Sequence, residues 1–280
     1  MATETEMTSL ADALVAPTLA AARAIMKYYR QDVAVMTKGD DSPVTKADQE
    51  AEEILLEALN RLMPGVPVVA EELASRGEAP AHGGDLFLVD PVDGTRGFIK
   101  GRPEFTVNVG LVSGGQPQFG LIYAPALSEF YVTTGPGTAL SANVAFSAEA
   151  DGIADLSARP MKTRPLDKCR LTAVSSRYVS KRLTRHLEGL SAERVDANSS
   201  IKFCILARGD ADLYPRYGEI SEWDTAAGAA IVASAGGCTT NFDGTPSVYG
   251  KTADGYRNAP FISWSTPTPD AELLAALNAD

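Results

Sequence analysis

The sequence predicts a mixed α/β protein whose first half is α+β and whose second half is α/β. Three observations favour this fold class. Residues 47–62 have helical periodicity, several consecutive strand-like runs follow between residues 66 and 133, and strand and helix patterns alternate from residue 169 to residue 235. Separate groups of helices and strands indicate α+β packing, whereas regular alternation indicates an α/β layer.

Two helices are expected at the start of the chain. The Ala-rich stretch from Leu10 to Arg30 predicts the first, and Pro17 is expected to shift its start or to kink it. Apolar residues at helical spacing over 47–62 predict the second helix, which Pro64-Gly65 ends. Asp48 is therefore expected in the first turn of the second helix.

Two short β-branched runs end in acidic residues. Val66 to Ala70 leads to Glu71, and Leu86 to Val89 leads to Asp90. Two strands thus deliver carboxylates at their C-terminal ends. An antiparallel meander is expected next, with strands over Phe105–Val112, Gln118–Tyr123 and Phe130–Thr133.

Residues 134–168 are small, polar and poorly periodic, which indicates a change of lobe. We therefore expect an α+β lobe over residues 1–136, carrying most metal ligands, and an α/β lobe over residues 137–280. The second lobe is expected to contain strands over 169–174, 194–196 and 211–214 and helices over 180–187, 200–207 and 225–235.

Composition limits the partners and the location of the protein. With 25 basic and 36 acidic residues, the net charge of -11 argues against a nucleic-acid polymer or an anionic membrane as the main partner. Cys169, Cys204 and Cys238 form no CxxC pair, so neither a disulfide framework nor a zinc site is indicated. The N-terminus lacks a basic leader, and we expect no spanning helix. A cytoplasmic protein is predicted, with peripheral membrane association left open.

The segment Asp90-Pro-Val-Asp93-Gly-Thr95 has the composition of a site for hard cations and a phosphate. Pro91 restricts the backbone between the two aspartates, whose oxygens suit Mg²⁺, Mn²⁺ or Ca²⁺. Gly94 permits a tight turn, so that amides near Thr95 could meet an anion. An isolated D-x-x-D is more often a pair of solvated loop acids, but its position after an apolar strand favours the metal interpretation.

Three further acids have both a structural and a functional interpretation. Glu71 ends the neighbouring strand and could join the aspartates. Asp224 opens an Ala-rich helix, where it could cap the helix, bind a cation, or do both. Asp48 could cap or flank the second helix through Thr45, or it could hold the Thr95 hydroxyl in an acid/base relay that deprotonates a metal-bound water.

A basic and aromatic group lies in the second half. Lys202 and Arg216 have a bland interpretation as surface charges. Together with Ser199 and Ser200, near a predicted helix start, they could instead bind a second phosphate. Tyr214 or Tyr217 could stack on a base. His82 and His186 are single and unclustered, so no histidine-based chemistry is predicted.

These motifs together resemble the lithium-sensitive, magnesium-dependent phosphatase superfamily of inositol monophosphatase. Its hallmarks stand here as Ala70-Glu71-Glu72, Asp90-Pro-Val-Asp93-Gly-Thr95 and Trp223-Asp224-Thr-Ala-Ala-Gly228. Further segments are similar to the bacterial CysQ branch of 3'(2'),5'-bisphosphate nucleotidases: Asp41–Asp48, Phe98–Lys100, Glu104–Asn108, Tyr123–Pro125, Ser199–Cys204 and Leu213–Arg216.

The resemblance implies a layered α/β/α/β/α sandwich and a complete site. Two or three Mg²⁺ ions would be bound by Glu71, Asp90, the Val92 carbonyl, Asp93 and Asp224. Asp48 and Thr95, with Glu71, would activate water, and the Gly94 and Thr95 amides would hold the phosphate beside the metal ligands. Ser176, Arg177, Ser200, Lys202 and Arg216 would approach the nucleotide. The implied reaction converts 3'-phosphoadenosine 5'-phosphate to AMP and phosphate.

One departure and two alternatives bear on this expectation. CysQ proteins usually carry Lys-Glu-Phe after Asp-Gly-Thr, whereas this chain has Arg96-Gly97-Phe98, which bears on specificity more than on catalysis. An inositol or other sugar monophosphatase with the same metal core is the nearest alternative. A non-catalytic nucleotide-binding regulator is a more remote one. No oligomeric state is predicted.

Overall fold

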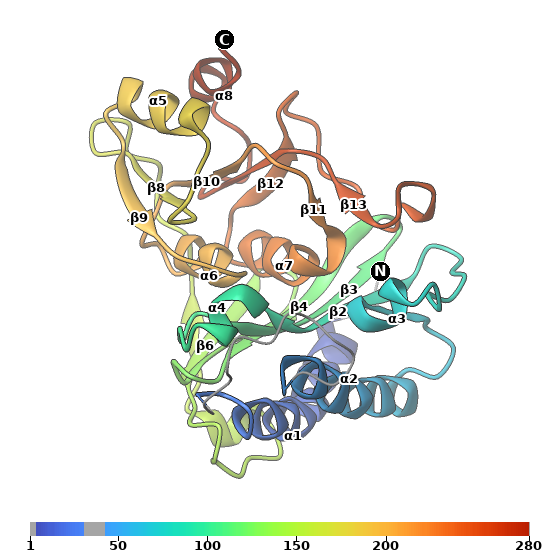
Figure 1. Cartoon of the computed structure of the whole chain (residues 1–280). Coiled ribbons are helices and arrows are strands. Elements are labelled where there is room, and N and C mark those ends of the chain that lie inside the picture. Colours follow the sequence, from blue (N-terminus) through green and yellow to red (C-terminus); the bar gives the residue numbers. More distant parts are fainter. Residues whose placement is uncertain (1–3, 31–42, 280) are drawn as a thin grey trace.

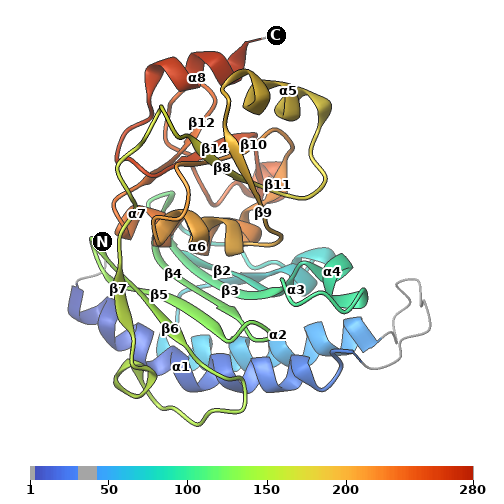
Figure 2. The same ribbon diagram turned by 90° about the vertical axis from the view of Figure 1, so that its left-hand side faces the viewer.

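The computed structural model describes residues 4–30 and 43–279. Its elements form five layers, and the mixed α/β fold class is confirmed (Figures 1 and 2). Helices α1 and α2 cover one face of a seven-stranded sheet, α6 and α7 fill the space between this sheet and a five-stranded one, and α5 and α8 cover the far side (Figure 2). Asp41 and Ser42 of the predicted Asp41–Asp48 motif lie outside the described residues.

The first layer differs from the expectation in its boundaries. α1 spans Glu4–Met26 and retains Pro17 in its interior, so of the two expected effects of Pro17 the shift of the helix start was wrong, and the kink stays a prediction. One missing N–H donor is tolerated because tertiary packing of an apolar face stabilises the helix. α2 spans Pro43–Leu62, so Asp48 lies in its second turn and not in the first. Pro43 supplies a favourable first residue, which a search for apolar periodicity does not detect.

One segment of α1, Thr5–Met26, is long and apolar enough to cross a membrane by length and composition, contrary to the expectation that no such run exists. Leu14, Val15 and Ile25 in this segment are fully buried. α1 packs against α2 and the first sheet. The apolar character of α1 is therefore explained by its place in the core.

The seven-stranded sheet follows the chain order and confirms the predicted meander. β1 is parallel to β2, and every later pair is antiparallel. The strands are β1 Val68–Ala70, β2 Leu86–Asp93, β3 Thr106–Ser113, β4 Gln116–Ala124, β5 Glu129–Gly135, β6 Thr138–Asn143 and β7 Arg159–Met161. β6 and β7 lie within residues 134–168, where a change of lobe was expected and no strand was predicted.

The two-lobe division at residue 136 stays a prediction. Because β6 and β7 belong to the first sheet, a division that follows the sheets would fall between Met161 and Thr172. β6 and β7 have six and three residues and each buries a single residue, so neither gives an alternating apolar pattern long enough to predict a strand.

The central helices lie close to the first sheet. α7, Ala226–Ser234, packs on β3 and β4, and α6, Ile201–Ala207, lies beside it. The backbone approach is so close that a Cβ on Gly120 of β4 would lie 2.1 Å from the Ala227 carbonyl oxygen. The missing side chain of Gly120 therefore permits the first turn of α7 to lie directly against the sheet, and Asp224 lies just before this turn.

The second sheet has the order β12-β14-β10-β8-β9. β8, β9 and β10 are parallel to one another and are separated by helices, which confirms the predicted alternation. β14 is antiparallel to β10 and β12. The members are β8 Thr172–Ser175, β9 Glu193–Asp196, β10 Leu213–Arg216, β12 Cys238–Asn241 and β14 Phe261–Trp264, covered by α5 Lys181–Gly189 and α8 Ala271–Asn278.

Short elements connect the layers around the sheet ends. They are α3 Glu71–Ser75, α4 Thr95–Ile99, the 3₁₀ turns η1 Ile153–Leu156, η2 Glu222–Asp224 and η3 Thr252–Asp254, and the two-stranded ribbon of β11 Ile220–Ser221 with β13 Arg257–Asn258. α3 follows β1 directly and α4 follows β2 after one residue. Both therefore begin where the sequence places acidic residues.

Candidate active site

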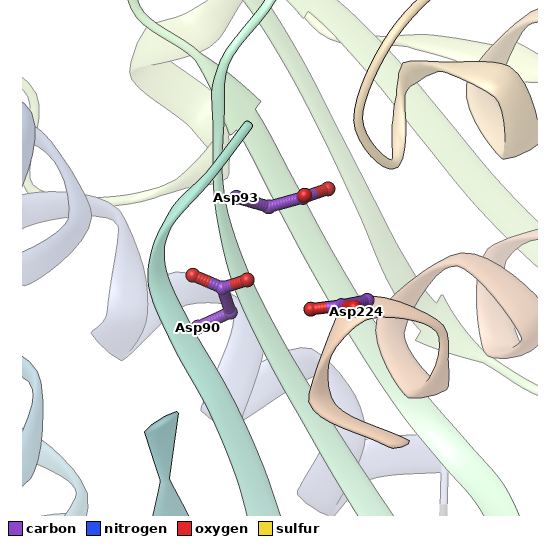
Figure 3. A group of neighbouring side chains, drawn as sticks. All are labelled: Asp90, Asp93 and Asp224. Atoms are coloured by element: carbon purple, nitrogen blue, oxygen red, sulfur yellow. The ribbon is translucent and has the colours of Figure 1, made fainter. Parts of the chain in front are cut away.

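Three carboxylates from distant parts of the chain meet at the end of β2. Asp90 and Asp93 belong to β2, and Asp224 ends η2 just before α7. One oxygen from each residue lies within 4.8 Å of those of the other two. Figure 3 shows these side chains converging from the strand and from the turn that faces it. We call Asp90, Asp93 and Asp224 the carboxylate cluster.

An irregularity in β2 lets Asp90 and Asp93 converge. In a regular strand, residues three apart point to opposite faces of the sheet. Here the register of the pairing with β3 shifts between Asp90 and Asp93. Pro91 lies within this interval and has no N–H to donate to the neighbouring strand. The Val92 amide donates to Asp90 Oδ1 at 2.9 Å, and this bond fixes the Asp90 carboxylate. The local sequence thus builds the convergence.

Burial and mutual repulsion favour the protonated forms of these acids. Burial raises the pKa of Asp90 well above its usual value, and the charges of Glu71, Asp93 and Asp224 add to this effect. Burial likewise raises the pKa of Asp224 to about 7, with a further contribution from Asp93. Burial raises the pKa of Asp93, although nearby Lys202 opposes the shift. A bound cation would relieve this repulsion.

Lowering the pH from about 8 to about 6 should weaken Mn²⁺ binding by about tenfold or more, because protons then compete for carboxylates of raised pKa. Titration calorimetry without substrate measures this affinity. The stability of the metal-free fold should change with pH in the opposite direction. Asp90 and Asp224 have raised pKa values in the folded chain, so they keep protons that the unfolded chain has already released. The free energy of unfolding should therefore fall as the pH rises from about 5 to about 8. A Mn²⁺ affinity that does not change with pH would contradict the shifted pKa values.

Glu71 and Asp48 lie on helices around the carboxylate cluster. Glu71 is the first residue of α3, and its charge contributes to the raised pKa of both Asp90 and Asp224. Asp48 is buried on α2, which packs against β2 and α4. Their predicted roles in metal binding and water activation stay predictions.

The Gly94-Thr95 turn leads from β2 into α4. Gly94 has a φ of 93°, and a Cβ there would lie 2.2 Å from Ser199 Oγ. Ser199 Oγ bonds to the carbonyl oxygens of Asp93 at 3.0 Å and Glu104 at 2.7 Å, which holds the turn from the second half of the chain. The Thr95 hydroxyl donates to the Val92 carbonyl at 3.1 Å. Only glycine fits this position without strain and crowding.

Ser200 and Lys202 are buried beside the turn and have partners within the chain. Ser200 Oγ bonds to Asn108 Oδ1 at 2.7 Å and to the Thr106 hydroxyl at 2.8 Å. Lys202 Nζ donates to the Ser199 carbonyl at 2.6 Å, and burial lowers the pKa of Lys202 to about 8. The Ser200 hydroxyl therefore supports the site from within, and contact of either residue with a nucleotide stays a prediction.

A pocket of about 340 Å³ lies where the parallel strands β8 and β10 end. Ligands of parallel α/β sheets commonly bind outside such carboxyl ends. The polar side chains of Ser176 and Arg216 line it. The positive charge of Arg216 opposes the rise in the pKa of Asp93 and of Asp224, so this residue links the pocket to the carboxylate cluster. Within the described part of the chain, Arg216 Nε is buried without a hydrogen-bond partner.

The tyrosines of this region divide into core and surface residues. Tyr214 is buried among Phe203 and Phe261, with ring centroids 5.1 and 5.3 Å away, so the hypothesis that Tyr214 stacks on a base is not supported. Tyr217 donates to the Leu277 carbonyl at 2.8 Å. Tyr178, which the sequence reasoning missed, lines the pocket with 86% of its surface exposed. The sequence signal for Tyr178 was its position two residues after Ser176, near the end of a predicted strand.

Arg177 lies beside this pocket but faces the first half of the chain. Its guanidinium is 3.6 Å from Glu104, whose carboxylate also accepts a hydrogen bond from the side-chain Nδ2 of Asn198. Arg177 is half exposed, so this ion pair contributes little to stability. Glu104 is a second residue whose place at the site was not predicted. The pair brings the segment after β8 close to the segment before β3.

The chain belongs to the inositol monophosphatase family, whose model matches residues 6–277. It is 37% identical over 229 residues to the 3'(2'),5'-bisphosphate nucleotidase CysQ of Escherichia coli K12, covering 81% of this chain and 88% of the relative. The corresponding protein of Salmonella typhimurium is 38% identical over 224 residues, with coverage of 79% and 86%.

Solved structures agree with this membership. CysQ from Bacteroides thetaiotaomicron, described as a bacterial member of the family, superposes with a TM-score of 0.77 at 31% identity over 92% of this chain and 97% of its own. An inositol monophosphatase from Zymomonas mobilis superposes with a TM-score of 0.72 at 24% identity over 99% and 97%, which supports the fold alone. The predicted family resemblance is confirmed.

Proposed function

We propose that this protein is a 3'(2'),5'-bisphosphate nucleotidase that hydrolyses the 3'-phosphate of 3'-phosphoadenosine 5'-phosphate to AMP and phosphate. The carboxylate cluster beside the Gly94-Thr95 turn is the observation that carries the proposal, because it joins oxygen ligands for cations to a turn suited to phosphate. The choice of a nucleotide rests on similarity to the CysQ nucleotidases and on the pocket at Arg216.

Proteins of this family are generally metal-dependent phosphatases. The residues present suit hard divalent cations, since every donor is oxygen and the carboxylates are buried together with raised pKa values. We propose Mg²⁺ as the cation, in two or three copies. The ligands would be Glu71, Asp90, the Val92 carbonyl, Asp93 and Asp224.

Bound divalent cations would lower the pKa of water and neutralise phosphate oxygens. The chain itself would supply orientation and a proton acceptor. α4 begins at Thr95, and the first backbone amides of a helix have no intrahelical partner. The amide of Thr95 and that of the residue after it can therefore donate to phosphate oxygens. The Thr95 hydroxyl now donates to Val92, so a relay through Thr95 requires this hydrogen to turn to a carboxylate, for which buried Asp48 is the proposed acceptor.

The pocket would receive the nucleoside and its second phosphate. Arg216 has a buried donor that lacks a partner among the described residues, and an anion would satisfy it. The exposed ring of Tyr178 is available to stack on a base. These contacts would distinguish a bisphosphate nucleotide from an inositol phosphate, which has no base and no second phosphate.

Phosphate release under steady-state conditions with excess Mg²⁺ tests the proposed reaction. We expect kcat/KM for 3'-phosphoadenosine 5'-phosphate to exceed that for myo-inositol 1-phosphate by about 100-fold or more, because binding energy from base and second phosphate assists the reacting centre. A preference for the inositol ester would favour a sugar monophosphatase. Tight nucleotide binding with no phosphate release from either ester would favour a non-catalytic regulator.

Arg216→Gln should lower kcat/KM for the nucleotide by about 10- to 100-fold, because a charge-assisted contact is lost from a partly buried site. The same variant should change kcat/KM for myo-inositol 1-phosphate by less. Arg185→Gln removes the same charge from the exposed face of α5, at a residue that does not line the pocket, and serves as the control. An equal loss on both esters would assign Arg216 to the common phosphate site and not to the nucleotide.

A further inference from the structure

Glu52 is a buried carboxylate outside the carboxylate cluster. Its side chain is 3% exposed and lies on α2, one helical turn after Asp48, so both acids occupy the same buried face of the helix. Burial raises the pKa of Glu52 to about 7. A carboxylate in such a place needs hydrogen-bond partners, because its desolvation otherwise opposes folding.

The partners of Glu52 belong to α3. Glu52 Oε2 accepts from the Glu72 amide at 2.9 Å, and the guanidinium of Arg76 lies 3.7 Å from the other carboxylate oxygen. The residue before α3 is Ala70, which has no side chain that could cap the helix. Glu52 therefore supplies from α2 the acceptor that the first turn of α3 lacks.

This contact bears directly on Glu71. Glu71 is the first residue of α3, and the amide held by Glu52 is that of the next residue. α3 has only five residues, so the helix has little intrinsic stability with which to fix its own first turn. Packing of α2 on β1 and β2 fixes the other side of the contact. The bond from the Glu72 amide to Glu52 thus joins α2 to the first turn of α3 and helps to fix the position of Glu71 relative to Asp90 and Asp48.

We propose that Glu52 is a positioning residue that holds Glu71 at the metal site through the Glu72 amide. The role rests on the proposed function, in which Glu71 is a metal ligand. Hydrogen bonds from the surrounding shell commonly orient metal ligands, and their removal costs about 10- to 100-fold in metal affinity. Glu52 contacts neither the substrate nor the reacting atoms. A change at Glu52 should therefore alter the affinity for metal even when no substrate is present.

Titration of Mn²⁺ into metal-free protein without substrate tests the proposal. We expect Glu52→Ala to raise the Mn²⁺ dissociation constant by about tenfold or more. Glu52→Gln keeps an acceptor oxygen and should stay within about threefold of the wild type. Glu53→Ala removes a neighbouring charge from the exposed face of α2 and should have no effect. If Glu52→Ala does not fold, Glu52→Leu fills the space without an acceptor and should show the same loss. Wild-type affinity in Glu52→Leu or Glu52→Ala would overturn the role.

A double-mutant cycle separates this proposal from the proposed function. If Glu52 acts through Glu71, adding Glu52→Ala to Glu71→Ala should weaken Mn²⁺ binding no further. Additive losses would overturn the proposed route through Glu71. Unchanged Mn²⁺ affinity in Glu71→Ala alone would overturn the ligand assignment under the proposed function, and the role of Glu52 with it. A loss in Glu71→Ala with none in Glu52→Ala would overturn the role of Glu52 alone.

Discussion

Asp93→Asn should lower kcat for phosphate release by about 1,000-fold or more, because the amide is neutral and a poor ligand for a hard cation. Asp93 lies closest to the Gly94-Thr95 turn of the three clustered acids in the sequence, so the variant removes charge where cations and phosphate would meet. Steady-state phosphate release with excess Mg²⁺ measures the effect. Near-wild-type turnover would rule out the proposed ligand set.

The same variant should keep its fold. Burial raises the pKa of Asp93, so replacing the carboxylate by a neutral amide removes a desolvation cost. The melting temperature of metal-free Asp93→Asn should therefore equal or exceed that of the metal-free wild type, while the gain on adding Mg²⁺ should shrink. Asp85→Asn, an exposed acid just before β2, is the matched control and should leave activity and stability unchanged.

Gly94→Ala should lower kcat by about 100-fold, because small displacements of a phosphate-binding turn disturb the alignment of the reaction. The added methyl would lie 2.2 Å from Ser199 Oγ and 3.1 Å from the Glu104 carbonyl oxygen. Ser199 can move only by giving up its bonds to the Asp93 and Glu104 carbonyls. The variant should also lose about 2 kcal/mol or more of unfolding free energy.

Gly65→Ala separates backbone strain from crowding. Gly65 has a φ of 99°, close to the 93° of Gly94, but a Cβ there would meet no atom within 4 Å. This control should lose only about 1 kcal/mol to strain and should keep full activity. Chemical denaturation gives the free energies and phosphate release the rates. Equal destabilisation and equal activity in both variants would show that the contact with Ser199 has no role.

Local patterns in the sequence account for most of the first half of the fold. α2 was predictable from the period of its buried face. β1, β2 and the first strand of the meander were predictable from continuous apolar runs, because both faces of these strands are buried. The acids that follow β1 and β2 could be expected close together because these neighbouring parallel strands end at the same edge of the sheet, and their role as a metal site stays a prediction. The β-bulge at Pro91 that turns Asp90 and Asp93 together was not, since register depends on the partner strand β3.

Features that depend on distant contacts were missed. β14 pairs with both β12 and β10 across long stretches of chain, and the short runs of β12 and β14 give no periodic signal. Glu52 resembles the solvated acids around it in sequence, although α3 buries it. Tyr214 was considered for base stacking because its burial among Phe203 and Phe261 is a tertiary property.

Anomalous diffraction from crystals soaked in Mn²⁺ tests the central claim most directly, because the scattering locates the cations without reference to activity. We predict anomalous density between Asp90, Asp93 and Asp224, with Glu71 at its edge, in the wild type and its loss in Asp93→Asn. Wild-type crystals that bind Mn²⁺ elsewhere, with none at these carboxylates, would contradict the account.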